Sequence, residues 1–319
     1  MPLLEVQNLK TYFKIKRGLV RAVDDISFEL EEGEALGLAG ESGCGKTTTA
    51  LSILRILPSN GIIVGGQILF KGIDLVKLTD DETRSNIRWK GISIVFQGAM
   101  NALNPVYKIR DQISEAIMLH EPDVTKEEAY ERVGKLFELV GIEPSRSINF
   151  PHEFSGGMRQ RSMIAMALSC NPSLLIADEP GTALDVIVAA QVLKLMRELR
   201  QKLNLSMIMI SHDLSIIAET CQKTAIMYGG KIVEYADVNT IFGEPMHPYT
   251  QGLIGAFPSI KAKKTRMISI PGSPPDLLSP PPACRFHPRC AYAMDICKKV
   301  EPKFAEIRKK HYVMCHLCH

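Results

Sequence analysis

The sequence contains no hydrophobic run long enough to cross a membrane. A membrane-spanning helix needs about 20 apolar residues in a row, whereas apolar stretches such as residues 205–210 and 224–228 have the length of buried parallel strands. The first residues also lack the basic segment and the long apolar segment of a signal peptide. We therefore expect a soluble, cytosolic chain.

The sequence also carries little excess charge. Lysine and arginine together number 38 and aspartate and glutamate 35, which leaves a net charge of +3. Because nucleic-acid binding usually needs a strongly basic surface, the composition gives no reason to expect DNA or RNA as the main partner. The one basic cluster, at residues 261–266, is expected to be a solvated segment.

A glycine-rich stretch with the spacing G-x-x-x-x-G-K-[ST] is the most informative part of the sequence. An apolar segment at residues 35–39 precedes it as an expected strand, and residues 48–57 follow it as an expected helix. At such a helix N-terminus the backbone N–H groups and the helix dipole attract a phosphate, and glycines let the backbone approach closely. Lys46 would reach the β- and γ-phosphates, and the Thr47 hydroxyl would ligate Mg²⁺. The stretch comprises Gly40, Glu41, Ser42, Gly43, Cys44, Gly45, Lys46 and Thr47.

Two carboxylates, Asp178 and Glu179, directly follow an apolar run at residues 174–177. The run predicts a buried strand, with Asp178 at its C-terminal end near the Mg²⁺. Glu179 lies where a carboxylate can polarise an attacking water, and phosphoryl transfer depends on such alignment and on charge neutralisation. Strands that end in acidic residues are common, so this interpretation depends on the phosphate loop upstream.

The pattern of apolar and polar residues divides the chain into four stretches. Residues 1 to about 97 alternate strand-like and turn-like segments, and residues 98 to about 160 are helical, with a capping box at Thr125 and Glu128. The alternation returns from about 161 to 245, and a proline-rich tract and a cysteine-rich tail follow. This order predicts a doubly wound α/β core with a helical insertion, and a C-terminal extension at residues 246–319.

A second anion-binding helix start, Ser155-Gly156-Gly157-Met158, lies between the phosphate loop and the acidic strand end. Together with Ser211-His212-Asp213 downstream, this order of motifs resembles an ATP-binding cassette ATPase over residues 1 to about 245. The resemblance implies a P-loop NTPase core of the RecA-like type, with a mostly parallel sheet. It also implies an antiparallel β subdomain and a helical subdomain inserted at about 98–160.

The resemblance also implies roles for individual residues. Glu179, His212 and Gln97 would be catalytic, with Gln97 contacting the Mg²⁺ and the attacking water and His212 contacting the γ-phosphate. Residues 183–185 would communicate across a dimer of ATPases. The implied Mg²⁺ ligands are Thr47, Gln97 and Asp178. The implied nucleotide-binding residues are Phe13 (or Tyr12) stacking on adenine, the phosphate loop, Thr48, Gln97, Asp178, and Ser155, Gly156 and Gly157, which would bind the partner's nucleotide.

The tail narrows the resemblance to one group of cassette ATPases. Residues 247–250, the proline tract at 270–275 and the segment Phe286-His287-Pro288-Arg289-Cys290 are similar to the C-terminal extension of dipeptide and oligopeptide importer ATPases. That family holds an iron–sulfur cluster on four cysteines, so the resemblance assigns a [4Fe–4S] cluster to a tail that is expected to fold separately from the phosphate loop. The spacing alone leaves zinc, disulfides and free thiols open, and Cys318 could replace the last ligand. The implied ligands are Cys284, Cys290, Cys297 and Cys315.

The function implied by the resemblance is ATP hydrolysis coupled to the import of dipeptides or oligopeptides, or of another small solute such as an oligosaccharide or a metal ion. The implied partners are a second cassette ATPase, in a heterodimer or homodimer, two integral membrane permeases and, indirectly, an extracytoplasmic solute-binding protein. The chain would then lie peripherally on the cytoplasmic face of the membrane.

Two alternatives come from other classes of protein. A soluble cassette ATPase of DNA repair or translation would predict two cassettes, a coiled coil or a basic arm, and the sequence shows none of these. A P-loop nucleotide kinase would not explain the Ser155-Gly156-Gly157 helix start or His212.

Overall fold

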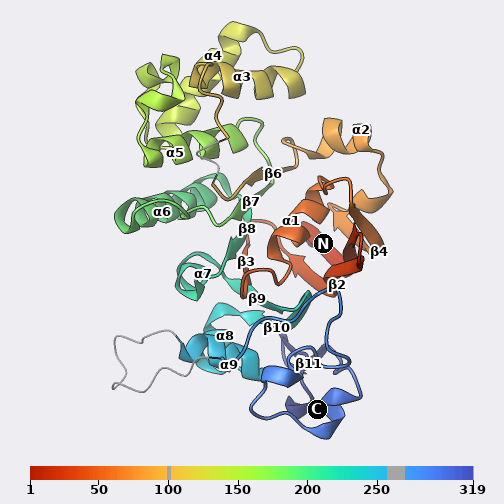
Figure 1. Cartoon of the computed structure of the whole chain (residues 1–319). Coiled ribbons are helices and arrows are strands. Elements are labelled where there is room, and N and C mark those ends of the chain that lie inside the picture. Colours follow the sequence, from red (N-terminus) through yellow and green to blue (C-terminus); the bar gives the residue numbers. More distant parts are fainter. Residues whose placement is uncertain (99–101, 257–269, 319) are drawn as a thin grey trace. The chain divides into compact units, whose positions relative to one another are not determined.

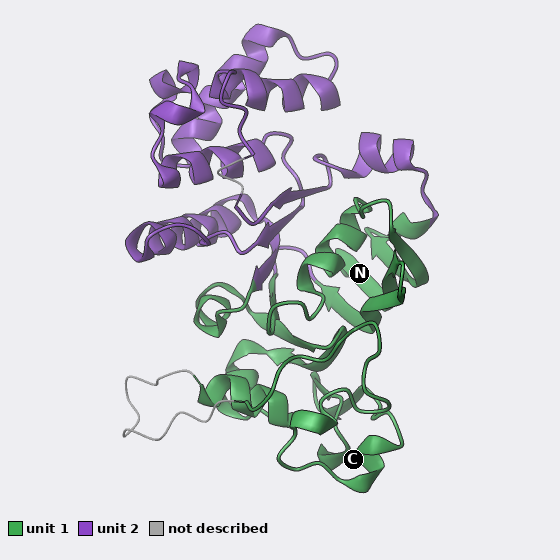
Figure 2. Cartoon of the chain, in the orientation of Figure 1, with its two compact units in different colours: residues 1–30, 35–76, 211–319 green, residues 31–34, 77–210 purple. Residues whose placement is uncertain are grey.

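The structure is a computed structural model of the chain and describes residues 1–98, 102–256 and 270–318 (Figure 1). The chain divides into two compact units (Figure 2). Unit 1 comprises residues 1–30, 35–76 and 211–319, and unit 2 comprises residues 31–34 and 77–210. The basic cluster at 261–266 lies outside the described residues. In the part of the chain that is described, no helix is both long and apolar enough to span a membrane.

Unit 1 contains an antiparallel sheet of four strands in the order β2-β1-β4-β5. Its strands alternate between buried and exposed positions because successive side chains point to opposite faces. In β2, for example, Ile26, Phe28 and Leu30 are all buried. This is the antiparallel subdomain that the resemblance implied. The strands are β1 (Leu4–Ile15), β2 (Gly18–Leu30), β4 (Gly61–Phe70) and β5 (Ile73–Asp74).

Unit 1 also contains the strands that carry the phosphate loop and the tail. β3 is completely buried and pairs in parallel with β9, which is followed by antiparallel β10, β12 and β11. The helix α7 lies so close to β3 that a Cβ at Gly37 would come within 2.3 Å of Ile217. The strands are β3 (Ala35–Ala39), β9 (Lys223–Tyr228), β10 (Lys231–Asp237), β11 (Ala305–Arg308) and β12 (His311–Val313), and the helices are α1 (Lys46–Leu54), α7 (Leu214–Thr220), α8 (Val238–Gly243) and α9 (Pro248–Gly255).

The tail belongs to the same compact unit as the phosphate loop. The sequence had predicted instead a tail that folds separately from the loop. Both belong to unit 1, and tail strand β12 pairs with β10 through Glu234 opposite Val313 and Tyr235 opposite Tyr312. The tail therefore extends a sheet that also contains β3, the strand that leads into the loop.

Unit 2 contains parallel strands in the order β8-β7-β6, with helical segments between them in the chain. The apolar runs at residues 174–177 and 205–210 predicted β7 and β8 to within a residue or two. The helices α3, α4 and α5 pack on one another and form the expected insertion. The elements are α2 (Asp80–Glu82), β6 (Ile92–Val95), α3 (Ile109–His120), α4 (Lys126–Leu139), α5 (Gly156–Ala167), β7 (Leu174–Asp178), α6 (Val186–Leu203) and β8 (Ser206–Ser211), whose last residue belongs to unit 1.

The capping box predicted within the insertion is confirmed. The Thr125 hydroxyl accepts a hydrogen bond from the Glu128 N–H at 3.3 Å, and the Glu128 carboxylate accepts one from the Thr125 N–H at 2.8 Å. The apolar face of α4 is buried as expected, because its residues recur at helical spacing. Its buried residues are Ala129, Val133, Leu136 and Phe137.

Candidate functional site

The phosphate loop of unit 1 contains three glycines in backbone conformations that other residues rarely adopt. Gly40, Gly43 and Gly45 have φ angles of 147°, 78° and 109°, which side chains disfavour. A Cβ at Gly40 would lie 2.2 Å from the Met227 carbonyl oxygen, and one at Gly45 would lie 2.3 Å from the Ala22 carbonyl oxygen. Helix α1 begins directly on this turn, two residues earlier than expected. The loop therefore has the close-wrapped backbone of an anion-binding helix start.

Lys46 holds its ammonium group inside the loop. Its Nζ donates to the carbonyl oxygens of Gly40 at 2.7 Å and of Glu41 at 3.0 Å, and the side chain is buried. Burial also raises the pKa of the neighbouring Cys44 thiol, so this side chain adds no negative charge at neutral pH. Thr47 is exposed at the start of α1. The loop thus holds one buried cation, and the exposed Thr47 follows it at the start of the helix.

His212 lies in the turn between β8 and α7, in unit 1. The Ser211 hydroxyl accepts a hydrogen bond from the Asp213 N–H at 2.9 Å, and Asp213 caps α7 by accepting from the Ser215 N–H at 2.8 Å. These bonds fix the turn and leave the His212 side chain exposed.

The predicted acid and glutamine of unit 2 lie together at the ends of neighbouring parallel strands. Asp178 is buried as the last residue of β7. Glu179 follows in the left-handed conformation, with a φ of 47°. Its Oε2 accepts hydrogen bonds from Gln97 Nε2 at 2.9 Å and from the Thr182 hydroxyl at 3.0 Å. Thr182, which orients the Glu179 carboxylate, was not predicted from the sequence.

The second helix start, also in unit 2, has a capping serine at its tip. Ser155 is exposed, and its hydroxyl accepts a hydrogen bond from the Met158 N–H at 3.3 Å. A Cβ at Gly157 would lie 2.5 Å from the Val188 side chain of α6, so this position also requires glycine. At the nearby start of α6, Val186 and Ile187 expose 86% and 72% of their surface. Such exposed apolar side chains are typical of a protein–protein contact.

The two candidates for adenine stacking differ in their surroundings. The Tyr12 hydroxyl donates to the Asp24 carboxylate at 2.6 Å, and burial together with this contact raises the pKa of Tyr12 to about 12. Phe13 is half-buried, and its ring lies 2.9 Å from where a Cβ of Gly61 would be. Because the Tyr12 side chain is bound to Asp24, these contacts favour Phe13.

The tail cysteines do not support the expected iron–sulfur cluster or zinc site. All eight cysteines of the chain are free thiols. Among the described residues, no group of three or more Cys, His, Asp or Glu side chains is arranged to hold a metal ion. The thiols of Cys284, Cys290 and Cys315 have raised pKa values, about 12 for Cys315, chiefly because they are buried. Metals bind thiolates, so these thiols would have to lose their protons before they could hold a metal.

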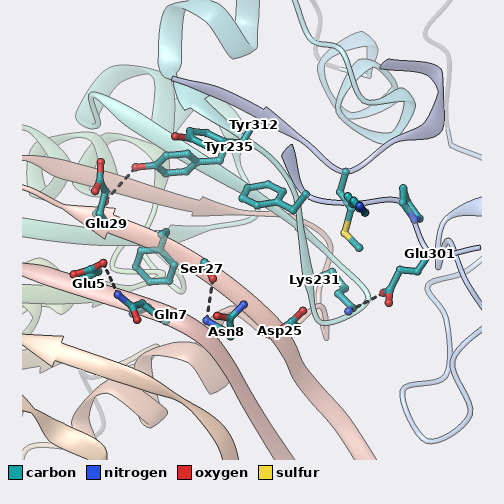
Figure 3. A pocket seen from close by; sticks show the side chains of 16 residues that line it. Glu5, Gln7, Asn8, Asp25, Ser27, Glu29, Lys231, Tyr235, Glu301 and Tyr312 are labelled. Carbon is teal, nitrogen blue, oxygen red and sulfur yellow. Dashed lines mark hydrogen bonds and ion pairs between the residues drawn. The ribbon is translucent and has the colours of Figure 1, made fainter. Parts of the chain in front are cut away.

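A pocket of about 670 Å³ in unit 1 is lined by none of the predicted nucleotide-binding residues (Figure 3). Residues of β1, β2, β10 and the tail line it, and Lys231 forms an ion pair with Glu301 at 2.7 Å on one side. Two acidic residues, Glu5 of β1 and Glu29 of β2, lie on the other side. None of these residues was predicted from the sequence to be functional.

Two parts of the chain match known protein families. Residues 23–182 match the family described as ABC transporter, and residues 233–297 match the family described as oligopeptide/dipeptide transporter, C-terminal region. The oligopeptide transport ATP-binding protein OppD of Bacillus subtilis is 46% identical, and the match covers 99% of this chain and 89% of the relative. The dipeptide transport ATP-binding protein DppD of the same organism is 45% identical, over 98% of this chain and 94% of the relative.

A solved structure shares the fold. The dimeric structure of the ATP-binding cassette MJ0796 bound to ADP and Pi gives a TM-score of 0.65 at 24% identity, and the match covers 74% of this chain and 98% of that chain. At this identity the likeness shows the fold alone: an ATP-binding cassette with a mixed sheet and surrounding helices.

Proposed function

Because the chain belongs to the ATP-binding cassette transporter family, we propose that it is the ATP-hydrolysing subunit of an importer for dipeptides or oligopeptides. The observation that carries the peptide assignment is the match of residues 233–297 to the C-terminal region of oligopeptide/dipeptide transporters. Relatives that match along nearly the whole chain carry the same function in their names.

In unit 1 the loop at residues 40–47 binds the phosphates of ATP. Lys46 balances the charge of the β- and γ-phosphates, and Phe13 stacks on the adenine. Thr47, with its exposed hydroxyl, offers a hard oxygen ligand of the kind that Mg²⁺ prefers. His212 contacts the γ-phosphate. The positive-φ glycines and the buried ammonium of Lys46 support this assignment.

In unit 2 Glu179 polarises the water that attacks the γ-phosphate, and Gln97 orients that water. Their hydrogen bond of 2.9 Å supports a joint role, and the Thr182 hydroxyl fixes the same carboxylate oxygen. Asp178 offers a further oxygen ligand for Mg²⁺, which supplies charge neutralisation when it is bound.

Dimerisation and membrane attachment use surfaces of unit 2. Ser155, Gly156 and Gly157 bind the nucleotide held by a second ATPase subunit, and the exposed Val186 and Ile187 support a contact there. The permeases dock on the helical insertion. Its exposed apolar side chains, Val106, Tyr107 and Leu119, support this docking. Such docking would place the chain peripherally at the membrane.

Co-purification tests this function against a soluble cassette ATPase. Affinity purification of the chain from detergent-solubilised membranes is expected to recover integral membrane chains and a second ATPase subunit, identified by mass spectrometry. Substituting Val106 and Tyr107 with serine should lower the recovery of membrane chains without lowering that of the ATPase partner. Recovery of nucleic acid or ribosomal proteins in place of membrane chains would contradict the proposal.

We propose in addition that Cys284, Cys290, Cys297 and Cys315 act as one ligand set for an iron–sulfur cluster, with zinc as the alternative. The crowding of cysteines in the tail supports this proposal, as does the hydrogen bond that the Cys284 N–H donates to the Cys297 carbonyl oxygen at 3.1 Å. Binding would require the side chains to rearrange and to lose their protons.

Elemental analysis tests the ligand set. Anaerobically purified protein is expected to be brown and to contain stoichiometric iron and sulfide, and replacing any one of the four cysteines with serine should remove the metal. Cys170→Ser, at a buried cysteine of unit 2, is the matched control and should retain it. Colourless protein that contains one zinc ion would show that the ligand set binds zinc and not an iron–sulfur cluster. Metal-free protein with reactive tail thiols would refute the ligand set.

A further inference from the structure

An arginine of the tail forms a two-pronged ion pair with the phosphate loop. Arg289 Nη1 donates to Glu41 Oε2 at 2.7 Å, and Nη2 donates to Glu41 Oε1 at 3.0 Å. The Arg289 side chain is 6% exposed and the Glu41 side chain 27%. Both residues belong to unit 1, so the contact lies within one compact body. Charge-assisted pairs with this parallel geometry are among the strongest and most directional polar contacts in proteins.

Arg289 is itself held from two further sides. Its Nε donates to the Pro271 carbonyl oxygen at 2.7 Å, so the proline tract contributes to its placement. Its guanidinium lies over the Tyr228 ring at 5.6 Å from the centroid, at the end of β9. The hydrogen bond to Glu41 is the main cause of a raised Arg289 pKa, so the guanidinium stays charged. The tail thus offers the loop a fixed cation.

Glu41 is held through its backbone as well as through its side chain. Its N–H donates to the Tyr249 hydroxyl at 3.0 Å, and its carbonyl oxygen accepts from Lys46 Nζ at 3.0 Å. Tyr249 is completely buried, and its ring centroid lies 4.6 Å from that of Tyr228 and 5.4 Å from that of Phe286. Glu41, which accepts a hydrogen bond from the phosphate-binding lysine, is therefore anchored by the side chains of Tyr249 and Arg289. Both of these residues lie beyond residue 245.

We propose that the C-terminal extension braces the phosphate loop, and that Arg289 is a positioning residue that sets the affinity for ATP by holding Glu41. A loop that is already fixed in its binding conformation loses less entropy when the ligand binds, which raises affinity without a new contact to the ligand. A change that breaks the Arg289–Glu41 pair therefore weakens ATP binding. This inference rests on the proposed function, because it takes residues 40–47 to be the ATP-binding loop.

The test compares ATP binding in variants of the full-length chain. Arg289→Lys keeps the positive charge but loses the paired geometry, and it is expected to weaken binding of a fluorescent ATP analogue by about tenfold, within the range usual for coupling between two sites. Glu41→Gln should weaken binding to a similar degree, and the double variant should be no weaker than either single variant, because all three break the same link. The KM for ATP should rise while kcat changes little.

Arg285→Lys is the matched control. Arg285 is another buried arginine of the tail, and it pairs with Asp24 and the Gly229 carbonyl instead of the phosphate loop. The Arg285→Lys variant should lower the melting temperature about as much as Arg289→Lys does, but its affinity for ATP should equal that of the wild type. Wild-type affinity in Arg289→Lys, in a chain whose wild type binds ATP, would overturn the brace and leave the proposed function standing. A wild type that binds no ATP would overturn the proposed function itself.

Discussion

Replacing Glu179 with glutamine is expected to lower ATP hydrolysis by about 10²–10⁴-fold, the usual contribution of a positioned general base. The amide has the shape of the carboxylate, so the contacts with Gln97 and Thr182 can be retained in part, but it cannot take a proton from water. ATP binding should persist because the phosphate loop is unchanged. The variant should therefore accumulate as an ATP-bound dimer.

Steady-state hydrolysis and size-exclusion chromatography with ATP check this result in the assembled transporter. Glu198→Gln makes the same chemical change on the exposed face of α6, where Glu198 pairs only loosely with Lys194 at 3.8 Å, and it should leave turnover normal. Near-normal turnover of Glu179→Gln would show that another group activates the water.

Replacing Ser155 with arginine should damage the nucleotide site of the partner subunit, and leave the site in its own subunit intact. Ser155 caps a helix start that can bind an anion, and its side chain is exposed. A bulky cation there would block the approach of the γ-phosphate held on the partner's loop. We expect hydrolysis at that site to fall by about 10²-fold, as when a donor to a developing anion is removed.

Mixed dimers distinguish the two sites. A Ser155→Arg chain is paired with a chain in which Lys46→Ala inactivates the phosphate loop, and then with an intact chain. The site built on the intact partner's loop should lose activity in the second pairing. Ser145→Arg, at another exposed serine of unit 2, should have no effect. If only the variant's own loop loses activity, Ser155 does not act on the partner.

The sequence predicted the core of the fold well where local signals agreed. The strand β7 follows from one apolar run, and the helix α4 follows from the capping box of Thr125 and Glu128. The tail strands β11 and β12 could not be predicted, because both are short and β12 pairs with β10 across a long separation in the chain. Pairing at such a distance depends on packing that no local pattern records.

The same contrast holds for the candidate site. Motifs that are contiguous in the sequence could be predicted, whereas contacts between distant residues could not be predicted from spacing. The phosphate loop and Asp178-Glu179 are contiguous motifs, so spacing alone indicated their chemistry. The hydrogen bond between Gln97 and Glu179 joins residues 82 positions apart, and only the family resemblance pointed to it. Glu41, the partner of Arg289, lies 248 positions away in the chain. The segment that contains Arg289 indicated the family but not this contact. The protonation and the placement of the tail thiols likewise depend on how deeply each thiol is buried, which the spacing of the cysteines in the sequence does not show.

ATP-driven uptake of a labelled oligopeptide into proteoliposomes tests the central claim most directly. The vesicles contain the chain together with the permeases and the second ATPase that co-purify with it, and the solute-binding protein is added on the side from which peptide is taken up. We predict uptake that requires ATP, and that disappears when Glu179→Gln replaces the wild-type chain although the complex still assembles. An assembled complex that hydrolyses ATP without moving any peptide would contradict the account.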